Sequence, residues 1–231
     1  PTNASKQPLG VNWNRFQKEP MKLSDVDNYF KDHYNIGVLT GGTSRVVCLD
    51  ADMKYDLTGT LWDRFYDSIP ERLRDVIYLQ KTVGGGYHLV FIAPESCLMP
   101  NEKLASRYTT PEKKNQTYID AYKDPDTREH ALKTAINDKQ RVLFETRSGS
   151  PEVCGGYFLI APSDGYEYVK GKICEVSEED YDLIMSIARS FNEVKNTHKY
   201  KDDYSSQGFA ISPFDDYNDK SDVLSLLVES G

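Results

Sequence analysis

The segment VVCLDAD, Val46 to Asp52, joins an apolar strand-like run to two carboxylates and constrains the fold more than any other part of the chain. Side chains alternate between the two faces of a strand, so Asp50 and Asp52 point to one face while Leu49 and Ala51 point to the other. Two carboxylates on one face suit a hard divalent cation such as magnesium. The same spacing also occurs where Asp only caps or turns the chain, so the motif alone leaves both interpretations open.

A run of three glycines leads into a second predicted strand in KTVGGGYHLVFIAP. Glycines permit positive φ angles and allow backbone N–H groups to approach an anionic phosphate closely. The residues in and around this run that form a candidate phosphate-binding site are Lys81, Thr82, Gly85, Gly86 and His88. The alternative is a hairpin turn followed by a structural histidine.

The segment VLFETRSG supplies a third carboxylate. Glu145 and Arg147 share a face if this segment is extended. A carboxylate beside a guanidinium suits a site that holds both a metal and a triphosphate. The alternative is a surface ion pair that contributes little to stability.

The order of these motifs resembles the bifunctional primase-polymerase (prim-pol) domain of the archaeo-eukaryotic primase superfamily, of the plasmid and phage replication type. The matching features are Lys6, Pro8 and Trp13, NIGVLTGG at 35–42, VVCLDAD, the GGxH element that ends at His88, the Glu145–Arg147 element, and GGYFLIAPS at 155–163. They span about the first three quarters of the chain. One departure is Glu145, since the family often has Asp at that position.

The resemblance implies which residues carry the chemistry. Asp50, Asp52 and Glu145 are expected to hold two catalytic ions, Mg²⁺ or Mn²⁺, and His88 is expected to contact the phosphates of the incoming nucleotide. One ion would activate a 3′-hydroxyl for attack on the α-phosphorus, and the other would neutralise the pyrophosphate leaving group. We expect Arg147, together with Lys81, to add phosphate contacts.

Secondary-structure signals support an α+β fold, and the resemblance implies a primase-like core with an RRM-like sheet. Strands are predicted at 46–49, 76–79, 88–92, 142–146 and 157–160. Helices are predicted from Ser24 toward Tyr34, over about 58–68, and after Ser177. This order fits a sheet that helices cover on one face. The polar stretch 101–140 is predicted to be a solvated excursion, with a DNA-contacting flap as the alternative.

We expect residues 1–175 to form the catalytic domain. Residues 176–231 are expected to form a helical appendage and linker, with a further helix near Lys220, leading to a missing downstream region. The charge distribution agrees with this division. The first part carries 23 Lys and Arg against 24 Asp and Glu, and the second carries 5 against 12, so most of the net charge of −8 lies in the second part.

Other features indicate a soluble protein of a reducing compartment, and we expect a cytoplasmic location, in the host cell if the protein is encoded by a phage. The four cysteines are scattered without a CxxC pair, which argues against a structural zinc site. The sequence shows no signal peptide and no apolar run long enough to span a membrane.

The resemblance implies a template-dependent nucleotidyltransferase, a DNA primase and DNA polymerase, that acts in replication of a mobile element or phage. Its expected partners are single-stranded DNA template and primer, dNTPs or NTPs, and a fused or associated helicase. No association with a membrane is expected. Two alternatives stay open. One is a metal-dependent nuclease, although a nuclease needs no triphosphate pocket. The other is a non-catalytic DNA-binding module of a replication protein.

Overall fold

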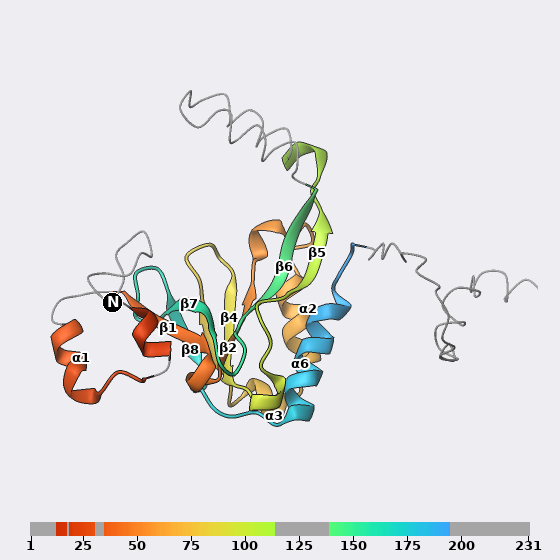
Figure 1. Ribbon diagram of the computed structural model, residues 1–231. Helices are drawn as coiled ribbons and strands as arrows, with labels where there is room; N and C mark the ends of the chain where they lie inside the picture. The colour runs from red at the N-terminus through yellow and green to blue at the C-terminus, as the bar shows by residue number, and fades with distance from the viewer. Residues whose placement is uncertain (1–12, 18, 31–34, 114–138, 195–231) are drawn as a thin grey trace, which may run out of the picture. The chain divides into compact units, whose positions relative to one another are not determined.

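The computed structural model describes residues 13–17, 19–30, 35–113 and 139–194. Over these residues the chain has the predicted α+β fold, with an eight-stranded sheet whose named strands all pair antiparallel. The strands are β1 (Ile36–Gly41), β2 (Val46–Ala51), β3 (Tyr78–Lys81), β4 (Tyr87–Ile92), β5 (Lys103–Tyr108), β6 (Gln140–Arg147), β7 (Cys154–Ile160) and β8 (Glu167–Lys170). Six of them follow the order β5-β6-β2-β4-β3-β8, while β1 pairs with both β2 and β7 (Figure 1).

Short helices connect the strands, and a longer one closes the described part of the chain. The 3-10 helices are η1 (Trp13–Gln17), η2 (Gly42–Ser44), η3 (Met53–Tyr55) and η4 (Glu95–Cys97). The α-helices are α1 (Leu23–Tyr29), α2 (Leu61–Ser68), α3 (Glu71–Arg74) and α6 (Glu178–Ser190). As predicted, helices cover one face of the sheet, because buried residues of α2, α3 and α6 share one apolar core with the sheet.

The central strand β2 is buried on both faces. Leu49 and Ala51 pack into the core beneath the helices, which includes Phe65 of α2. Cys48 belongs to a second, smaller core on the opposite face, together with Phe158 of β7. The alternation predicted for VVCLDAD is therefore confirmed, and β1 and β7 contribute the apolar cover over part of the second face.

Two of the predicted helix starts require correction. Helix α2 begins at Leu61 rather than near Thr58, because the Asp56 carboxylate accepts hydrogen bonds from the backbone N–H groups of Thr58 (2.8 Å) and Leu61 (3.0 Å) and holds the intervening residues in a capping loop. Helix α1 begins at Leu23, after Lys22, so Ser24 lies inside the helix and is not its N-cap. The predicted N-cap of α6 is correct, since the Ser177 hydroxyl accepts a hydrogen bond from the backbone N–H of Asp180.

The stretch 101–140 is not only a polar excursion. Its first part forms β5, which pairs with β6 through two irregularities in the register. Leu104, Ala105 and Ser106 are all buried, so the strand lacks the apolar-polar alternation by which strands are predicted. Residues 114–138 lie outside the described part of the chain.

Helix α6 packs against the sheet and lies within a compact unit, Pro1–Lys195. The predicted linker and the helix predicted near Lys220 lie outside the described residues.

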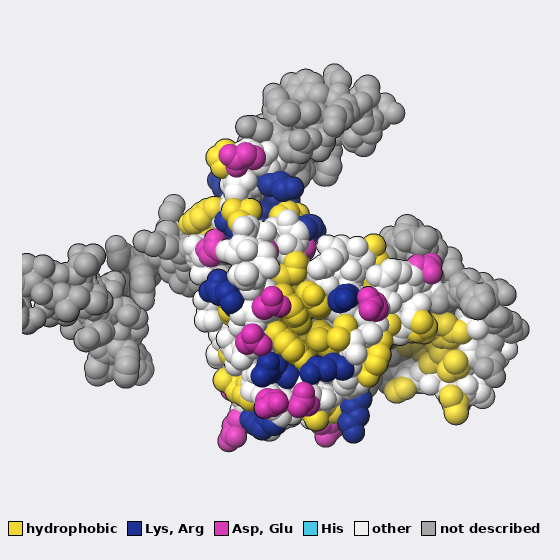
Figure 2. Space-filling view, turned by 180° about the vertical axis from the view of Figure 1, so that it is seen from behind, with side chains coloured by type: hydrophobic (Ala, Val, Ile, Leu, Met, Phe, Trp, Pro, Cys, Tyr) yellow, Lys and Arg dark blue, Asp and Glu magenta, His cyan; other side chains and the backbone are white. Residues whose placement is uncertain are grey.

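In the rear view, Lys and Arg side chains alternate with Asp and Glu around a hydrophobic patch (Figure 2). Of the helices that the structure describes, none has the length and apolar character needed to cross a membrane.

Candidate active site

Three neighbouring strands place a histidine and two carboxylates in one row across the sheet. Asp50 of β2 lies directly opposite Glu145 of β6 on one side and His88 of β4 on the other. Residues directly opposite each other in an antiparallel sheet point to the same face, with Cβ atoms about 5 Å apart. Strand pairing thus brings together three of the predicted site residues, although they lie far apart along the chain.

Cationic groups balance the carboxylates in this row. Arg147 contacts Glu145, and its Nη2 atom lies 3.8 Å from Oδ2 of Asp50. On the other side of Asp50, Oδ1 lies 3.6 Å from Nε2 of His88. A guanidinium between two carboxylates offsets their mutual repulsion, so Asp50 and Glu145 converge on the same positive charge.

Asp52 lies just past the end of β2, and its side chain has other partners than those of Asp50 and Glu145. Its backbone N–H donates to the carbonyl of Leu143 (2.9 Å), which continues the pairing between β2 and β6. Its carboxylate caps η3 and lies 2.6 Å from Nζ of Lys54. Burial alone would lower the pKa of Lys54, but its hydrogen bond and charge interaction with Asp52 raise that pKa above its usual value. In this structure Asp52 is therefore paired with Lys54.

The three carboxylates fit divalent metals by chemistry, since Mg²⁺ and Mn²⁺ prefer hard oxygen ligands. In the described part of the chain, however, no group of three His, Cys, Asp or Glu side chains is gathered closely enough to hold a metal ion. Arg147 and Lys54 supply the positive charge beside the carboxylates instead. Metal binding would require Asp52 to exchange Lys54, and Asp50 and Glu145 to exchange Arg147, for the metal.

The glycine run forms the turn of the β3–β4 hairpin. Thr82 and Gly86 are joined by two hydrogen bonds, from Thr82 N–H to the Gly86 carbonyl (2.9 Å) and from Gly86 N–H to the Thr82 hydroxyl (3.1 Å). Gly85 has a positive φ of 77°. A Cβ on Gly86 would lie 2.2 Å from the carbonyl oxygen of Ala51. The glycine run is therefore a hairpin turn, as the alternative interpretation of the sequence had it. Its contacts with phosphate remain a prediction.

The model of the bifunctional DNA primase/polymerase N-terminal family, Prim-Pol, matches residues 1–179. The chain belongs to the Prim-Pol family. The resemblance inferred from the motifs is thereby confirmed, and membership supports a DNA primase/polymerase function in general. A comparison with curated proteins gives no match.

One predicted site residue of this Prim-Pol domain lies away from the carboxylate row. Lys81 is paired with Tyr87, one step along the strands from the pair formed by Gln80 and His88. Because strand side chains alternate, Lys81 points away from the face that carries His88. Its Nζ atom lies 3.8 Å from a carboxylate oxygen of Glu167. The geometry does not favour Lys81 as a phosphate contact.

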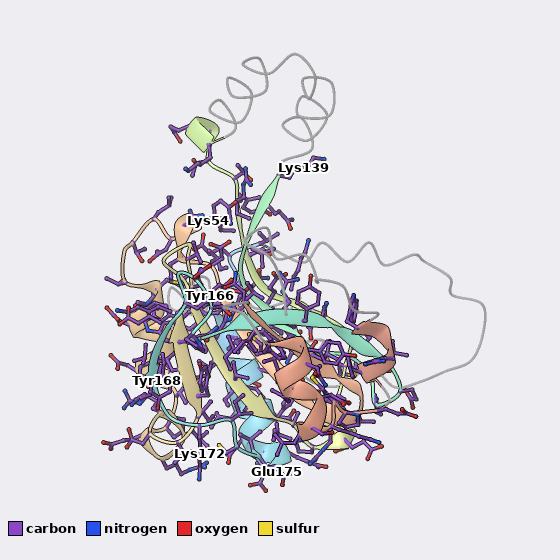
Figure 3. The ribbon with its side chains drawn as sticks, turned by 90° about the vertical axis from the view of Figure 1, so that its left-hand side faces the viewer. Lys54, Lys139, Tyr166, Tyr168, Lys172 and Glu175 are labelled. Atoms are coloured by element: carbon purple, nitrogen blue, oxygen red, sulfur yellow. The ribbon has the colours of Figure 1, made fainter. Side chains whose placement is uncertain are left out.

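Sequence reasoning missed the buried surroundings of His88. Gln80 donates a hydrogen bond from Nε2 to Nδ1 of His88 (2.8 Å). The rings of Phe158 and Tyr166 lie 5.4 and 5.9 Å from the imidazole. In Figure 3, Tyr166 and Lys54 lie in the upper part of the described chain, and Lys172 and Glu175 lie at its lower end. The strand predicted at 76–79 ended before Gln80, whereas β3 extends to Lys81 and its pairing with β4 sets Gln80 opposite His88.

Cys48 lies next to this row, opposite Arg147. It is fully buried, and burial raises the pKa of its thiol well above the usual value. The nearby Asp50 carboxylate raises that pKa further, while Arg147 opposes the shift. The thiol therefore stays protonated and is not a candidate nucleophile.

A cavity of about 210 Å³ lies elsewhere, beside the loop after η3 and the start of α2. Its lining includes Asp56, Arg64 and Arg107, but none of the residues in the carboxylate row. The carbonyl of Leu143, another lining residue, accepts the hydrogen bond from Asp52. The cavity is thus close to the loop that carries Asp52 but is not the predicted nucleotide site.

Proposed function

We propose that this Prim-Pol chain is a template-dependent nucleotidyltransferase that extends a DNA strand with the help of two divalent ions, Mg²⁺ or Mn²⁺. The observation that carries the proposal is the row formed by Asp50, Glu145 and His88 on adjacent strands. The Asp50 and Glu145 side chains are each 24% exposed. They are therefore held by the sheet yet remain accessible to a ligand from solvent.

Asp50, Asp52 and Glu145 are the residues that would hold the ions. When bound, the ions supply Lewis-acid activation of the attacking hydroxyl and neutralise charge on the departing pyrophosphate. The chain itself has little covalent work to do. Its residues orient the triphosphate and stabilise the charge that develops on it.

Two side chains are suited to the triphosphate. His88 presents Nε2 on the carboxylate side of the sheet, where an N–H group can donate to a phosphate oxygen. Arg147 is 41% exposed and already lies among the carboxylates. If Asp50 and Glu145 held the ions, the Arg147 guanidinium beside them would be free to contact the phosphates. Thr82, Gly85 and Gly86 hold the hairpin that carries His88.

The proposed partners are single-stranded DNA template and primer, dNTPs or NTPs, and a fused or associated helicase. The proposed setting is replication of a mobile element or phage. These rest on family membership and on the sequence, and the experiment below tests the DNA and nucleotide components.

The test offers the chain Mn²⁺ and nucleotides with primed and unprimed single-stranded templates, and separates the products by length. Extension of the primer supports a polymerase, and short products on the unprimed template support a primase. Shortened substrate would instead indicate a nuclease. DNA binding without any product would indicate a binding module, and either result would overturn the proposal.

A matched pair of variants ties the activity to the site. Asp50→Asn removes the central carboxylate of the row with little change in size, and we expect it to abolish nucleotide addition. Asp63→Asn removes an exposed carboxylate from α2, and we expect it to retain the activity. Equal activity of the two variants would show that the carboxylate row is not the catalytic site.

A further inference from the structure

We infer that Gln80 is a positioning residue that holds His88 in the tautomer whose proton is on Nε2. Neither the motifs nor the family match assigns a role to Gln80. Its consequence for nucleotide binding rests on the proposed function, whereas the tautomer itself does not.

Gln80 is fully buried, and its amide uses all of its hydrogen-bonding capacity. The oxygen Oε1 accepts from the backbone N–H of Ala161 (2.8 Å) and from the hydroxyl of Tyr78 (3.1 Å). The nitrogen Nε2 donates to the carbonyl of Leu159 (2.8 Å) and to Nδ1 of His88 (2.8 Å). The side chain thus connects β3, the end of β7 and β4.

The two backbone partners determine which way the amide points. A backbone N–H can only donate and a backbone carbonyl can only accept. If the amide were rotated by half a turn, its NH₂ group would face the Ala161 N–H and its oxygen would face the Leu159 carbonyl. Both hydrogen bonds would be lost inside the core, where unpaired polar groups are unfavourable. The orientation is therefore set without reference to the histidine.

The orientation of the amide then determines the protonation of His88. Since Gln80 directs an N–H toward Nδ1, that atom must act as an acceptor, and the proton of the neutral ring lies on Nε2. The Nε2 atom lies 3.6 Å from Oδ1 of Asp50, at the carboxylate row. His88 therefore presents a hydrogen-bond donor at the site. The other tautomer would present a lone pair there, which repels a phosphate oxygen.

Packing keeps the ring in this position. The ring of Phe158 meets the imidazole at an interplanar angle of 87°, and Tyr166 lies on the same face of the sheet at 5.9 Å. The His88 side chain is 6% exposed. The ring has little freedom to rotate, so a change of tautomer alters the chemistry presented to the site rather than the position of the ring.

NMR of isotope-labelled histidine ring nitrogens tests the tautomer on the full chain without nucleotide. The signal of His88 is assigned by its loss in His88→Asn. We expect Nδ1 to be unprotonated and Nε2 protonated in the wild type. In the neutral ring, a proton on Nδ1 rather than on Nε2 would overturn the inference.

Three substitutions extend the test. In Gln80→Glu a carboxylate replaces the donor, so the proton is expected to move to Nδ1. In Gln80→Met the donor is lost at similar size, so both tautomers are expected. In Tyr78→Phe the backbone bonds still orient the amide, so the wild-type tautomer is expected to persist. A wild-type tautomer in both Gln80 variants would overturn the inference, and the wild-type measurement stands even if a variant fails to fold.

Nucleotide addition provides the second measurement. We expect Gln80→Met to raise KM for the nucleotide about tenfold, the effect of weakening one hydrogen bond to a charged group, with a smaller change in kcat. An unchanged KM would contradict a role in nucleotide binding. If the wild type adds no nucleotide, the proposed function fails while the NMR result still decides the tautomer. If the wild type is active but His88 carries its proton on Nδ1, only the present inference fails.

Discussion

The two faces of the central sheet are built from the same strands but have different chemistry. On β6, Phe144 is buried beneath the helices, whereas its neighbour Glu145 faces the carboxylate row. On β4, Leu89 belongs to the apolar core and His88 to the row. The main apolar core and the carboxylate row are therefore separated by a single step along each strand, and only the second, smaller core shares the face of the row. Substitutions at adjacent positions can test the two properties independently.

Glu145→Gln is expected to cause a large loss of activity on the face that carries the row. The variant keeps the size of the side chain but loses the negative charge that a divalent ion needs. We expect the rate of nucleotide addition to fall by about a thousandfold or more, with an unchanged thermal unfolding midpoint. A variant that loses activity and stability together would break the proposed separation of the two faces.

Phe144→Ala is expected to have the opposite outcome, a large loss of stability. The Phe144 ring is fully buried and lies 4.6 Å from the ring of Phe65. Removing a buried phenyl group costs about 3 to 5 kcal/mol, from lost burial and from the cavity that remains. Urea unfolding measures this change. Leu183→Ala, at a residue that is 37% exposed on α6, is the control and is expected to cost far less.

Gly86→Ala is expected to affect both stability and activity, because the glycine contacts the end of β2. A Cβ at Gly86 would lie 2.2 Å from the Ala51 carbonyl oxygen, so the turn or the strand has to shift. We expect a cost of about 1 to 3 kcal/mol in unfolding experiments and a loss of activity through displacement of His88. Gly84→Ala is the matched control, since nothing lies within 4 Å of its added Cβ. Equal behaviour of the two variants would show that this close approach is unimportant.

Local patterns predicted the strands and carboxylates of the site well. The apolar run before Asp50 and the alternation within it are properties of a few neighbouring residues, and the motif order identified the family. The register that sets Asp50 between Glu145 and His88 is different, because it depends on β2 being the strand between β4 and β6. No local pattern contains that strand order.

The parts that sequence reasoning missed depend on partners distant in the chain. The sequence around Gln80 does not indicate its role, because its backbone hydrogen-bond partners, Leu159 and Ala161, come from the end of β7. Strand β5 was missed because consecutive residues are buried rather than alternate ones. Lys81 was placed at the site by its nearness in sequence to the glycine run, but strand alternation directs it away.

The smallest effect is expected for an ion pair between two helices, α3 and α6. Arg72 donates two hydrogen bonds to the Asp180 carboxylate (2.5 and 2.9 Å). This contact holds the pKa of Asp180 below its usual value, so the unfolded chain binds the proton more readily than the folded one. The contact therefore stabilises the fold above the unfolded pKa of about 3.9, and this contribution is lost as the pH falls through the folded pKa.

Arg72→Ala should accordingly be less stable than the wild type near neutral pH, and the difference should shrink on acidification. Urea unfolding of both proteins across this pH range measures the effect, which we expect to be small and weaker at high salt because Arg72 is 62% exposed. A difference that is independent of pH would mean that Arg72 acts through packing of its aliphatic stem. Nucleotide addition should not change, because this ion pair lies on the helical layer rather than on the face that carries Asp50.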